Sequence, residues 1–403
     1  MKYILIIGDG MGDEPIAELD GKTPLEAAAT PSMDRLARQG EQFLVRTVPE
    51  GYPPGSDVAN LSLLGYAPEK YYTGRAPLEA ASMGVELGED EIAYRCNLVT
   101  LERTDGRVIM RDYSAGHITT GEGRTLIRDV QAQCGTGQVR LHPGISYRHL
   151  LVRRQGGPAV RTVPPHDHLD EDVTGFYRRY REAEDLGQLM ECAARLLAGH
   201  PVNQARQAAG SNPANSLWLW GEGKSPAMPS LADRYGLCGV LVSAVDLLKG
   251  IGVYAGLEVP EVEGATGYID TNYAGKVAAA LDGLARGDLA VIHLEGPDEA
   301  GHQGSLADKV QAIEDLDARV VAPMLAALEK GGDPFRLVVC MDHYTPLSLR
   351  THVDWPVPML MYDSRGVGQP SGLSFSEANA RAGRHGFPDG EHFFDYLITG
   401  AQQ

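Results

Sequence analysis

The chain has 403 residues, of which 43% are hydrophobic and 22% charged, and this length predicts two globular domains or one domain that carries an insertion. No segment reaches the ~18 consecutive apolar residues of a membrane span, and the formal net charge of −18 disfavours nucleic acid or an anionic membrane as a partner, because both require a basic face. A small anionic substrate would need a local cation to overcome this negative field, which makes a metal ion attractive.

The N-terminus and the cysteines predict a cytoplasmic protein with reduced thiols. The apolar stretch at residues 3–7 is too short for a secretory signal and lacks a basic flank and a cleavage site, so we expect the mature chain to begin here. The cysteines are odd in number, widely spaced and without a C-x-x-C pair, which argues against a disulfide framework or a thiolate zinc site. We expect reduced core cysteines at Cys96, Cys134, Cys192, Cys238 and Cys340.

The opening of the chain predicts a strand, a loop and a helix. KYILIIGDGMGD predicts a buried strand that breaks into a Gly/Asp loop, and PSMDRLARQG predicts a helix that ends at Gly40. The second half repeats this alternation, with strands expected at residues 239–244, 288–296, 335–343 and 357–363 and helices at 245–256, 271–287 and 305–332. Such alternation is typical of an α/β core with a mostly parallel sheet covered by helices on both faces.

The middle of the chain has a different pattern, from about residue 81 to residue 215. Strands are expected at residues 93–102, 106–113, 138–144 and 149–154, and helices at 123–134 and 174–199, separated by clusters of Gly, Pro and Asp. This pattern predicts a smaller α+β domain inserted into the core. We place the core at residues 1–78 and 228–403 and the inserted domain at residues 79–227.

Acidic and imidazole residues follow the ends of several predicted strands, where ligands gather in an open α/β sheet. Mn²⁺ and Zn²⁺ accept mixed carboxylate and imidazole ligands, and two ions need about six to eight protein ligands. The residues at these strand ends suffice for two ions when a serine joins them. They are Asp9, Asp298, His302, Asp342, His343 and His352.

Each of these residues also has a purely structural interpretation. Asp9 could be a helix cap or turn former, Asp298 and His302 could belong to a polar loop before the helix at Ser305, and His352 could be an ordinary loop histidine. The convergence of several ligand types at strand ends of one fold favours the metal site. The four-residue spacing of Asp298 and His302 would also place both on one side of a helical turn.

The stretch PEGYPPGSDVANLSLLGY places Ser56 between a Pro/Gly-rich loop and an apolar helix. Ser is a favoured N-cap, although Ala59 stands where a capping box would have Glu or Gln. A hydroxyl at a helix N-terminus can equally act as a nucleophile, because free backbone N–H groups suit a phosphate and a metal ion would lower the pKa of the hydroxyl. The two roles are compatible.

Several motifs, in order along almost the whole chain, resemble a known family. They are GDGMGD, PPGSDVANLSLLGY, YYTGRAPLEAASMGVEL, DYSAGHI, ANSLWLWGEGK, SAVDLLKGIG, EGATGYIDTNY, GPDEAGHQG and MDHYTPLSLRTHVDWPVPM. The combination is similar to the archaeal-type cofactor-independent phosphoglycerate mutases, which belong to the alkaline phosphatase superfamily. The resemblance implies an alkaline-phosphatase-like α/β core with an inserted α+β domain and an interconversion of 3-phosphoglycerate and 2-phosphoglycerate.

The resemblance also implies roles for the candidate residues. One divalent ion would be bound by Asp9, Ser56, Asp342 and His343, and the second by Asp298, His302 and His352. Ser56 would be the nucleophile that forms a phosphoserine and returns the phosphoryl group to the neighbouring hydroxyl of the same glycerate. Mn²⁺ is the expected metal, with Zn²⁺, Co²⁺ or Mg²⁺ as alternatives, and 2,3-bisphosphoglycerate is not required.

Cationic and polar residues on the inserted domain and its rim are expected to hold the substrate carboxylate and phosphate. Each could also be a helix-end cation, a solvated loop residue or a cap. The candidates are Arg75, His117, Arg148, His166, Asp167, Lys224 and Lys249.

Other functions fit parts of the same sequence. The loop GDGMGDEPIAEL and the segment around Ser56 resemble the bacterial branch of the family, part of which has been proposed to phosphorylate homoserine. A phosphomonoesterase would use the same metal core, but a domain that closes over the core would exclude water as the acceptor. A non-catalytic metal-binding protein is disfavoured, because every ligand position is retained together with Ser56.

Overall fold

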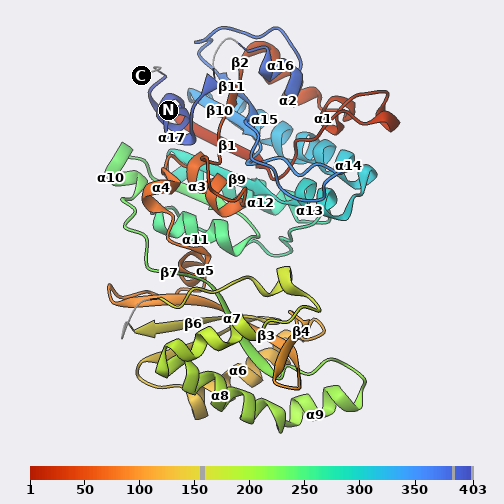
Figure 1. Ribbon diagram of the computed structural model, residues 1–403. Coiled ribbons are helices and arrows are strands. Elements are labelled where there is room, and N and C mark those ends of the chain that lie inside the picture. The colour runs from red at the N-terminus through yellow and green to blue at the C-terminus, as the bar shows by residue number, and fades with distance from the viewer. Residues whose placement is uncertain (155–158, 384–385, 401–403) are drawn as a thin grey trace. The chain divides into compact units, whose positions relative to one another are not determined.

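The computed structural model describes residues 1–154, 159–383 and 386–400 and forms two compact units (Figure 1). Unit 1 comprises Met1–Tyr72 and Ala227–Gln403, and unit 2 comprises Thr73–Pro226. Helix α5 (Arg75–Ser82), which a division after residue 78 would cut, lies entirely in unit 2, where it packs on the sheet. Among the described residues, no helix is both long and apolar enough to cross a membrane.

The described part of unit 1 is built on a seven-stranded sheet with the order β12-β2-β11-β10-β1-β9-β8. Strands β8, β9, β1 and β10 are parallel, whereas β11 is antiparallel to both of its neighbours. The prediction of a mostly parallel sheet is therefore confirmed. The strands are β1 (Lys2–Gly8), β2 (Glu41–Val45), β8 (Gly239–Val242), β9 (Leu289–Leu294), β10 (Phe335–Cys340), β11 (Val357–Asp363) and β12 (Gly386–Phe387).

Two groups of helices cover this sheet, as Figure 1 shows. One group contains α2, α12, α14 and α15, which meet around the π-helical turn η4, and the other joins α3 to α11 and α17. The elements are η1 (Ala17–Leu19), α1 (Pro24–Ala27), α2 (Pro31–Gln39), α3 (Ser56–Leu63), α4 (Pro68–Tyr71), α10 (Leu231–Tyr235), α11 (Asp246–Tyr254), α12 (Tyr273–Arg286), α13 (Gly296–Gln303), α14 (Leu306–Leu316), η4 (Asp317–Val321), α15 (Ala322–Gly331), α16 (Glu377–Arg381) and α17 (Gly390–Thr399).

Two local predictions in unit 1 compare directly with the structure. Helix α2 ends at Gly40 as expected from its sequence. The helix predicted over residues 305–332 is formed, but η4 interrupts it. Pro323 explains the interruption, because a proline ring clashes with the carbonyl four residues earlier and a wider π turn relieves that clash.

The described part of unit 2 contains a five-stranded antiparallel sheet with the order β4-β3-β6-β5 and with β7 paired to β3. The helix predicted over residues 174–199 is broken at Ala183, whose backbone is extended. The elements are α5, β3 (Glu91–Thr104), β4 (Arg107–Asp112), α6 (Thr120–Cys134), β5 (Val139–Ile145), β6 (Arg148–Arg154), η2 (Pro165–His168), α7 (Thr174–Arg179), η3 (Tyr180–Glu182), α8 (Glu184–Ala198), α9 (Pro201–Ala208) and β7 (Ser216–Gly223).

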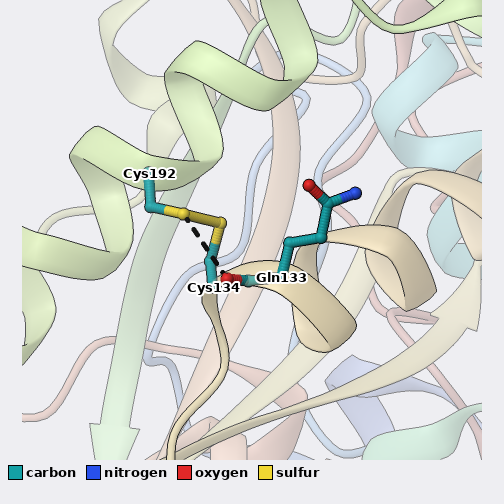
Figure 2. The surroundings of a disulfide bond; sticks show 3 residues. All are labelled: Gln133, Cys134 and Cys192. Carbon is teal, nitrogen blue, oxygen red and sulfur yellow. Dashed lines mark hydrogen bonds between the residues drawn. A yellow bond between two sulfur atoms is a disulfide. The ribbon is translucent and has the colours of Figure 1, made fainter.

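The prediction of reduced core cysteines is wrong for three of the five. Cys134, at the end of α6, and Cys192, in α8, form a disulfide with a Cα–Cα distance of 5.7 Å (Figure 2). The packing of α6 against α8 brings together two residues 58 positions apart, which cysteine spacing alone does not reveal. Cys238 is exposed, and Cys96 and Cys340 are buried free thiols as expected.

Loss of this disulfide is expected to destabilise unit 2 by about 2–4 kcal/mol, because the crosslink restricts a long loop of the unfolded chain. The double variant Cys134→Ser/Cys192→Ser should therefore melt at a lower temperature than the parent. A reducing agent should lower the melting temperature of the parent but not that of the double variant. Cys238→Ser is the matched control, and an equal loss of stability in that variant would contradict the prediction.

The chain enters and leaves unit 2 at one place. The hydroxyl of Thr73, the first residue of the unit, donates a hydrogen bond of 2.6 Å to the carbonyl oxygen of Lys224 near its end. Gly223 lies so close to the carbonyl oxygen of Thr73 that an added Cβ would come within 2.4 Å of it. The two ends of the insertion are therefore held side by side.

Candidate active site

Three buried carboxylates lie beyond the carboxyl ends of neighbouring parallel strands. Asp9 follows β1, Asp342 follows β10, and Asp298 lies in the first turn of α13, the helix that follows β9. Because β10, β1 and β9 are adjacent in the sheet, residues far apart in the sequence meet at one edge. The structure thus brings together the three acids that the strand pattern singled out.

Ser56 is the first residue of α3, and it does not cap this helix. Gly55 occupies the N-cap position, and the structure records no side-chain cap hydrogen bond there. The hydroxyl oxygen Oγ of Ser56 instead lies 3.1 Å from Nε2 of His343. The side chain is only partly buried, and the first turn of an α-helix leaves backbone N–H groups free to receive an anion.

A first group of candidate metal ligands, called the first ligand group below, surrounds Nε2 of His343. This nitrogen lies 3.3 Å from Oδ1 of Asp9 and 3.4 Å from Oδ2 of Asp342, in addition to its contact with Ser56. One donor atom from each of Asp9, Asp342 and His343 fits within a span of 4.8 Å. The four residues that the family resemblance assigns to one ion therefore converge.

The second ligand group combines Asp298 with two imidazoles. Nε2 of His302 lies 3.3 Å from Oδ2 of Asp298, and Nε2 of His352 lies 3.3 Å from Oδ1 of the same carboxylate. His302 and Asp298 are both in α13, four residues apart, as predicted. The ring of His352 also stacks on that of His343, with centroids 3.9 Å apart, so the two groups are neighbours.

Backbone carbonyls orient the two imidazoles of the second group. Nδ1 of His302 donates to the carbonyl oxygen of Arg350 at 2.9 Å, and Nδ1 of His352 donates to that of Pro54 at 2.8 Å. Arg350 adopts a left-handed backbone with φ of 55°, which is uncommon outside glycine. With a proton fixed on Nδ1, Nε2 is the atom of each ring that faces Asp298 and that a metal ion could bind after displacing any proton on it, as in metal-binding histidines.

The buried carboxylates of the site carry negative charge that a bound cation would neutralise. Burial and then the charges of Asp342 and Asp298 raise the pKa of Asp9 well above its usual value. Burial would also raise the pKa of Asp298, but hydrogen bonds from His302 and His352 hold it well below its usual value. Buried carboxylates at such short range repel one another unless positive charge lies among them.

Two details test whether divalent ions fit these residues. Nε2 of His302 and Nε2 of His352 face each other at 2.8 Å, where two lone pairs repel unless a proton or cation lies beside them. In the protein without ions, the hydrogen bond to Asp298 raises the pKa of His302 to about 9. Within the described chain, the buried Oδ1 of Asp9 has no hydrogen-bond partner. Carboxylate and imidazole donors left open in this way suit Mn²⁺ or Zn²⁺.

Several residues that the sequence pattern did not reveal support these ligands. Nε2 of the buried His293 lies 2.9 Å from Oδ2 of Asp9, and the hydroxyl of Thr345 donates to Oδ1 of Asp298. Burial lowers the pKa of His293 to about 3, so its ring is neutral. His293 lies within the apolar strand β9, and only the pairing of β9 with β1 places it beside Asp9.

Unit 2 carries a separate cluster of cationic and aromatic side chains. Burial lowers the pKa of the Arg95 guanidinium, and the charge of Glu79 opposes this effect. The positive charges of Arg75 and Arg148 lower the same pKa further, so these three arginines lie near one another. The Arg95 guanidinium lies 3.9 Å from the ring centroid of Trp220, and the ring of His166 lies 5.3 Å from the same side chain. The predicted residues Arg75, Arg148 and His166 are thus gathered around Arg95, which the sequence did not single out.

The other predicted substrate contacts are more dispersed. The ring of His117 lies 6.1 Å from that of Tyr147 beside the cluster, and a carboxylate oxygen of Asp167 lies 3.6 Å from Nε2 of His166. The side chain of Lys224 is exposed. Lys249 is in α11 of unit 1, where its ammonium pairs with Glu261 at 2.9 and 3.0 Å. Their contribution to substrate binding stays a prediction.

Comparison with known proteins places the chain in a family. Residues 37–203 match the family model of 2,3-bisphosphoglycerate-independent phosphoglycerate mutase. The chain is 52% identical over 398 residues to a Geobacter sulfurreducens protein named a probable 2,3-bisphosphoglycerate-independent phosphoglycerate mutase, with 99% of this chain and 100% of the relative covered. It is 48% identical over 400 residues to the mutase of this name from Methanosarcina acetivorans, with 99% and 100% covered.

Solved structures agree with these sequence matches. A Pyrococcus horikoshii protein superposes with a TM-score of 0.83 at 29% identity, covering 100% of this chain and 98% of the other. A cofactor-independent phosphoglycerate mutase from Thermoplasma acidophilum superposes with a TM-score of 0.68 at 28% identity, covering 100% of both chains. The resemblance noted in the sequence motifs is thereby confirmed. The chain belongs to the archaeal-type 2,3-bisphosphoglycerate-independent phosphoglycerate mutases, which are isomerases of glycolysis.

Proposed function

We propose that the protein interconverts 3-phosphoglycerate and 2-phosphoglycerate through a phosphoserine formed on Ser56. The observation that carries this proposal is the position of the Ser56 hydroxyl, at the start of α3 and 3.1 Å from His343, within the group that includes Asp9 and Asp342. A partly accessible hydroxyl among buried carboxylates and imidazoles is the arrangement that a nucleophile needs.

The transfer takes place in two steps of the same kind. In the first, Ser56 Oγ loses its proton and forms a bond to phosphorus, while the bond between phosphorus and the substrate oxygen breaks and that oxygen takes up a proton. In the second, the neighbouring hydroxyl of the same glycerate loses its proton and forms a bond to the phosphorus of the phosphoserine, while the bond between phosphorus and Ser56 Oγ breaks and Oγ takes up a proton. The free N–H groups of the first turn of α3 hold the phosphoryl oxygens in both steps.

Two divalent ions complete this proposal. Asp9, Ser56, Asp342 and His343 would hold one ion, and a second set would hold the other; this second set is Asp298, His302 and His352. When bound, such ions neutralise charge on phosphoryl and hydroxyl oxygens and lower the pKa of an attacking hydroxyl. We expect Mn²⁺, with Zn²⁺, Co²⁺ or Mg²⁺ as alternatives.

The cationic cluster of unit 2 supports an anionic substrate. Arg75, Arg95 and Arg148 lie near one another in a protein whose net charge is −18. Guanidinium groups bind carboxylate and phosphate in a bidentate manner, and phosphoglycerate carries both groups. We assign the direct substrate contacts to Arg75 and Arg148, the two arginines of this cluster that the sequence predicts as substrate contacts.

Removal and return of the metal is the test of this function. Protein stripped with a chelator is expected to lose mutase activity and to regain it with Mn²⁺, without added 2,3-bisphosphoglycerate. Formation of 2-phosphoglycerate from 3-phosphoglycerate, coupled to enolase, measures the activity. The restored rate should depend on the concentration of Mn²⁺ and not on that of bisphosphoglycerate.

The same preparation distinguishes the competing functions. Release of inorganic phosphate faster than isomer formation would indicate a phosphomonoesterase. Transfer from ATP to homoserine without any mutase activity would indicate a homoserine kinase. Either result would overturn the proposed interconversion, whereas failure of Mn²⁺ to restore any turnover would overturn the metal requirement.

A further inference from the structure

Asn60 joins the helix of the proposed nucleophile to one of the proposed metal ligands. It lies in α3, one turn after Ser56, and it is only 1% exposed. Its amide nitrogen Nδ2 donates one hydrogen bond of 2.8 Å to the backbone carbonyl of Ser56 and a second of 2.8 Å to Oδ2 of Asp342. Both partners accept hydrogen bonds only, so the amide must present its nitrogen to them.

Helix stability does not explain an asparagine at this position. Asn is a weaker helix former than Ala or Leu in a helix interior. The Oδ1 atom of Asn60 is also buried without a hydrogen-bond partner among the described residues, which costs about 1–3 kcal/mol. An apolar residue would fit a buried helix better. A residue that lowers helix stability and buries an unpaired polar atom is typical of a position selected for function.

The function that we infer for Asn60 concerns the carboxylate of Asp342, to which its amide donates a hydrogen bond. Its Oδ1 accepts the backbone N–H groups of Gly10 at 3.2 Å and of His343 at 2.9 Å. Its Oδ2, which lies 3.4 Å from Nε2 of His343, accepts a hydrogen bond from Asn60. Without Asn60, one oxygen of the carboxylate would lose its restraint, and the link between Asp342 and the start of α3 would be lost.

We propose that Asn60 is a positioning residue that fixes the Asp342 carboxylate relative to Ser56 and so sets the metal affinity of the first ligand group. This inference rests on the proposed metal-dependent mutase function and deepens it. Residues that hydrogen-bond to metal ligands commonly change metal affinity by about 10- to 100-fold when they are replaced. In this role Asn60 acts through its hydrogen-bond partners Asp342 and Ser56, not by binding the ion or the substrate itself.

Calorimetric titration of metal-stripped protein with Mn²⁺ tests this role. The variant Asn60→Leu, which removes the amide at similar volume, should bind one Mn²⁺ about 10- to 100-fold more weakly than the parent and the other with unchanged affinity. At saturating Mn²⁺, the variant should show a lower kcat with an unchanged KM for 3-phosphoglycerate, because no substrate contact is removed. If Asn60→Leu does not fold, Asn60→Ala replaces it in the same titration.

Asn203 supplies a matched control in unit 2. It is also 1% exposed, and its amide donates to the carbonyl oxygens of Leu197 and Ala214, both at 2.8 Å. Asn203→Leu should lower the melting temperature without changing Mn²⁺ affinity. Equal Mn²⁺ affinity in the parent, Asn60→Leu and Asn203→Leu would overturn the inference alone. Absence of Mn²⁺ binding by the parent would instead overturn the proposed function.

Discussion

Replacement of Ser56 by Ala is expected to lower mutase turnover by roughly 10⁴-fold or more, because the proposed phosphoserine can no longer form. The melting temperature should barely change. Gly55, not Ser56, occupies the N-cap of α3, so the substitution removes no cap hydrogen bond. Turnover measured with the enolase coupling, together with a thermal unfolding curve of the same sample, checks both parts of the expectation.

Ser62 in the same helix provides the control for this variant. It is 1% exposed, and its hydroxyl accepts the buried N–H of Gly390 at 3.2 Å. Ser62→Ala should therefore cost about 1–3 kcal/mol of stability, since that N–H loses its partner, while the turnover of the folded protein stays near that of the parent. If Ser56→Ala retained activity and lost stability instead, the serine would serve only the helix.

Replacement of Lys309 by Met is expected to cost about 3–5 kcal/mol, because it leaves a buried carboxylate without its counter-charge. Lys309 in α14 is 0% exposed, and its ammonium lies 2.7 Å from Oδ2 of Asp13. It also donates to the carbonyl oxygens of Gly12 and Thr345, at 3.0 and 2.8 Å. Burial lowers the pKa of Lys309, but the charge of Asp13 opposes this effect.

The contacts of Lys309 hold two loops of the candidate site, so the substitution is expected to loosen these loops. Gly12 and Thr345 lie in the loops that follow β1 and β10, and the same loops carry Asp9 and His343. Chemical unfolding followed by fluorescence measures the effect. The exposed Lys330 at the end of α15 is the control, and Lys330→Met should change stability by less than about 0.5 kcal/mol. Similar stability of the two variants would mean that the buried ion pair contributes little.

The convergence of the candidate metal ligands could be predicted from the sequence because one topological rule governs it. Asp9, Asp298 and Asp342 each follow a short apolar strand, and a mostly parallel sheet gathers such positions at one edge. The rule needs only the order of strands and helices, not their packing. His302 follows the same strand as Asp298, and helical spacing added support for it. For His352, which lies in a long loop between β10 and β11, the family resemblance was the decisive information.

Features that depend on packing between distant elements could not be predicted. The Cys134–Cys192 disulfide requires that α6 lie against α8. The contacts of His293 with Asp9 and of Asn60 with Asp342 require the pairing of β9 with β1 and the placement of α3. The reversed direction of β11 has a simple cause: no helix connects it to β10, and a parallel neighbour needs a long crossover. The alternation of strands and helices in the sequence does not predict that a strand will turn back and pair antiparallel with the strand before it.

The hydrogen bond that joins Thr73 to Lys224 has a consequence for how such a chain could be modified. The 154 residues of Thr73–Pro226 begin and end at nearly the same point. In the chain of unit 1 they therefore bridge only a short distance, between Tyr72 and Ala227. A different module with equally close ends could replace them without altering the sheet that carries the candidate metal ligands. Under the proposed function, the same candidate phosphotransfer residues could then act with a different substrate-binding module, so the choice of acceptor could change while the chemistry of the transfer stays the same.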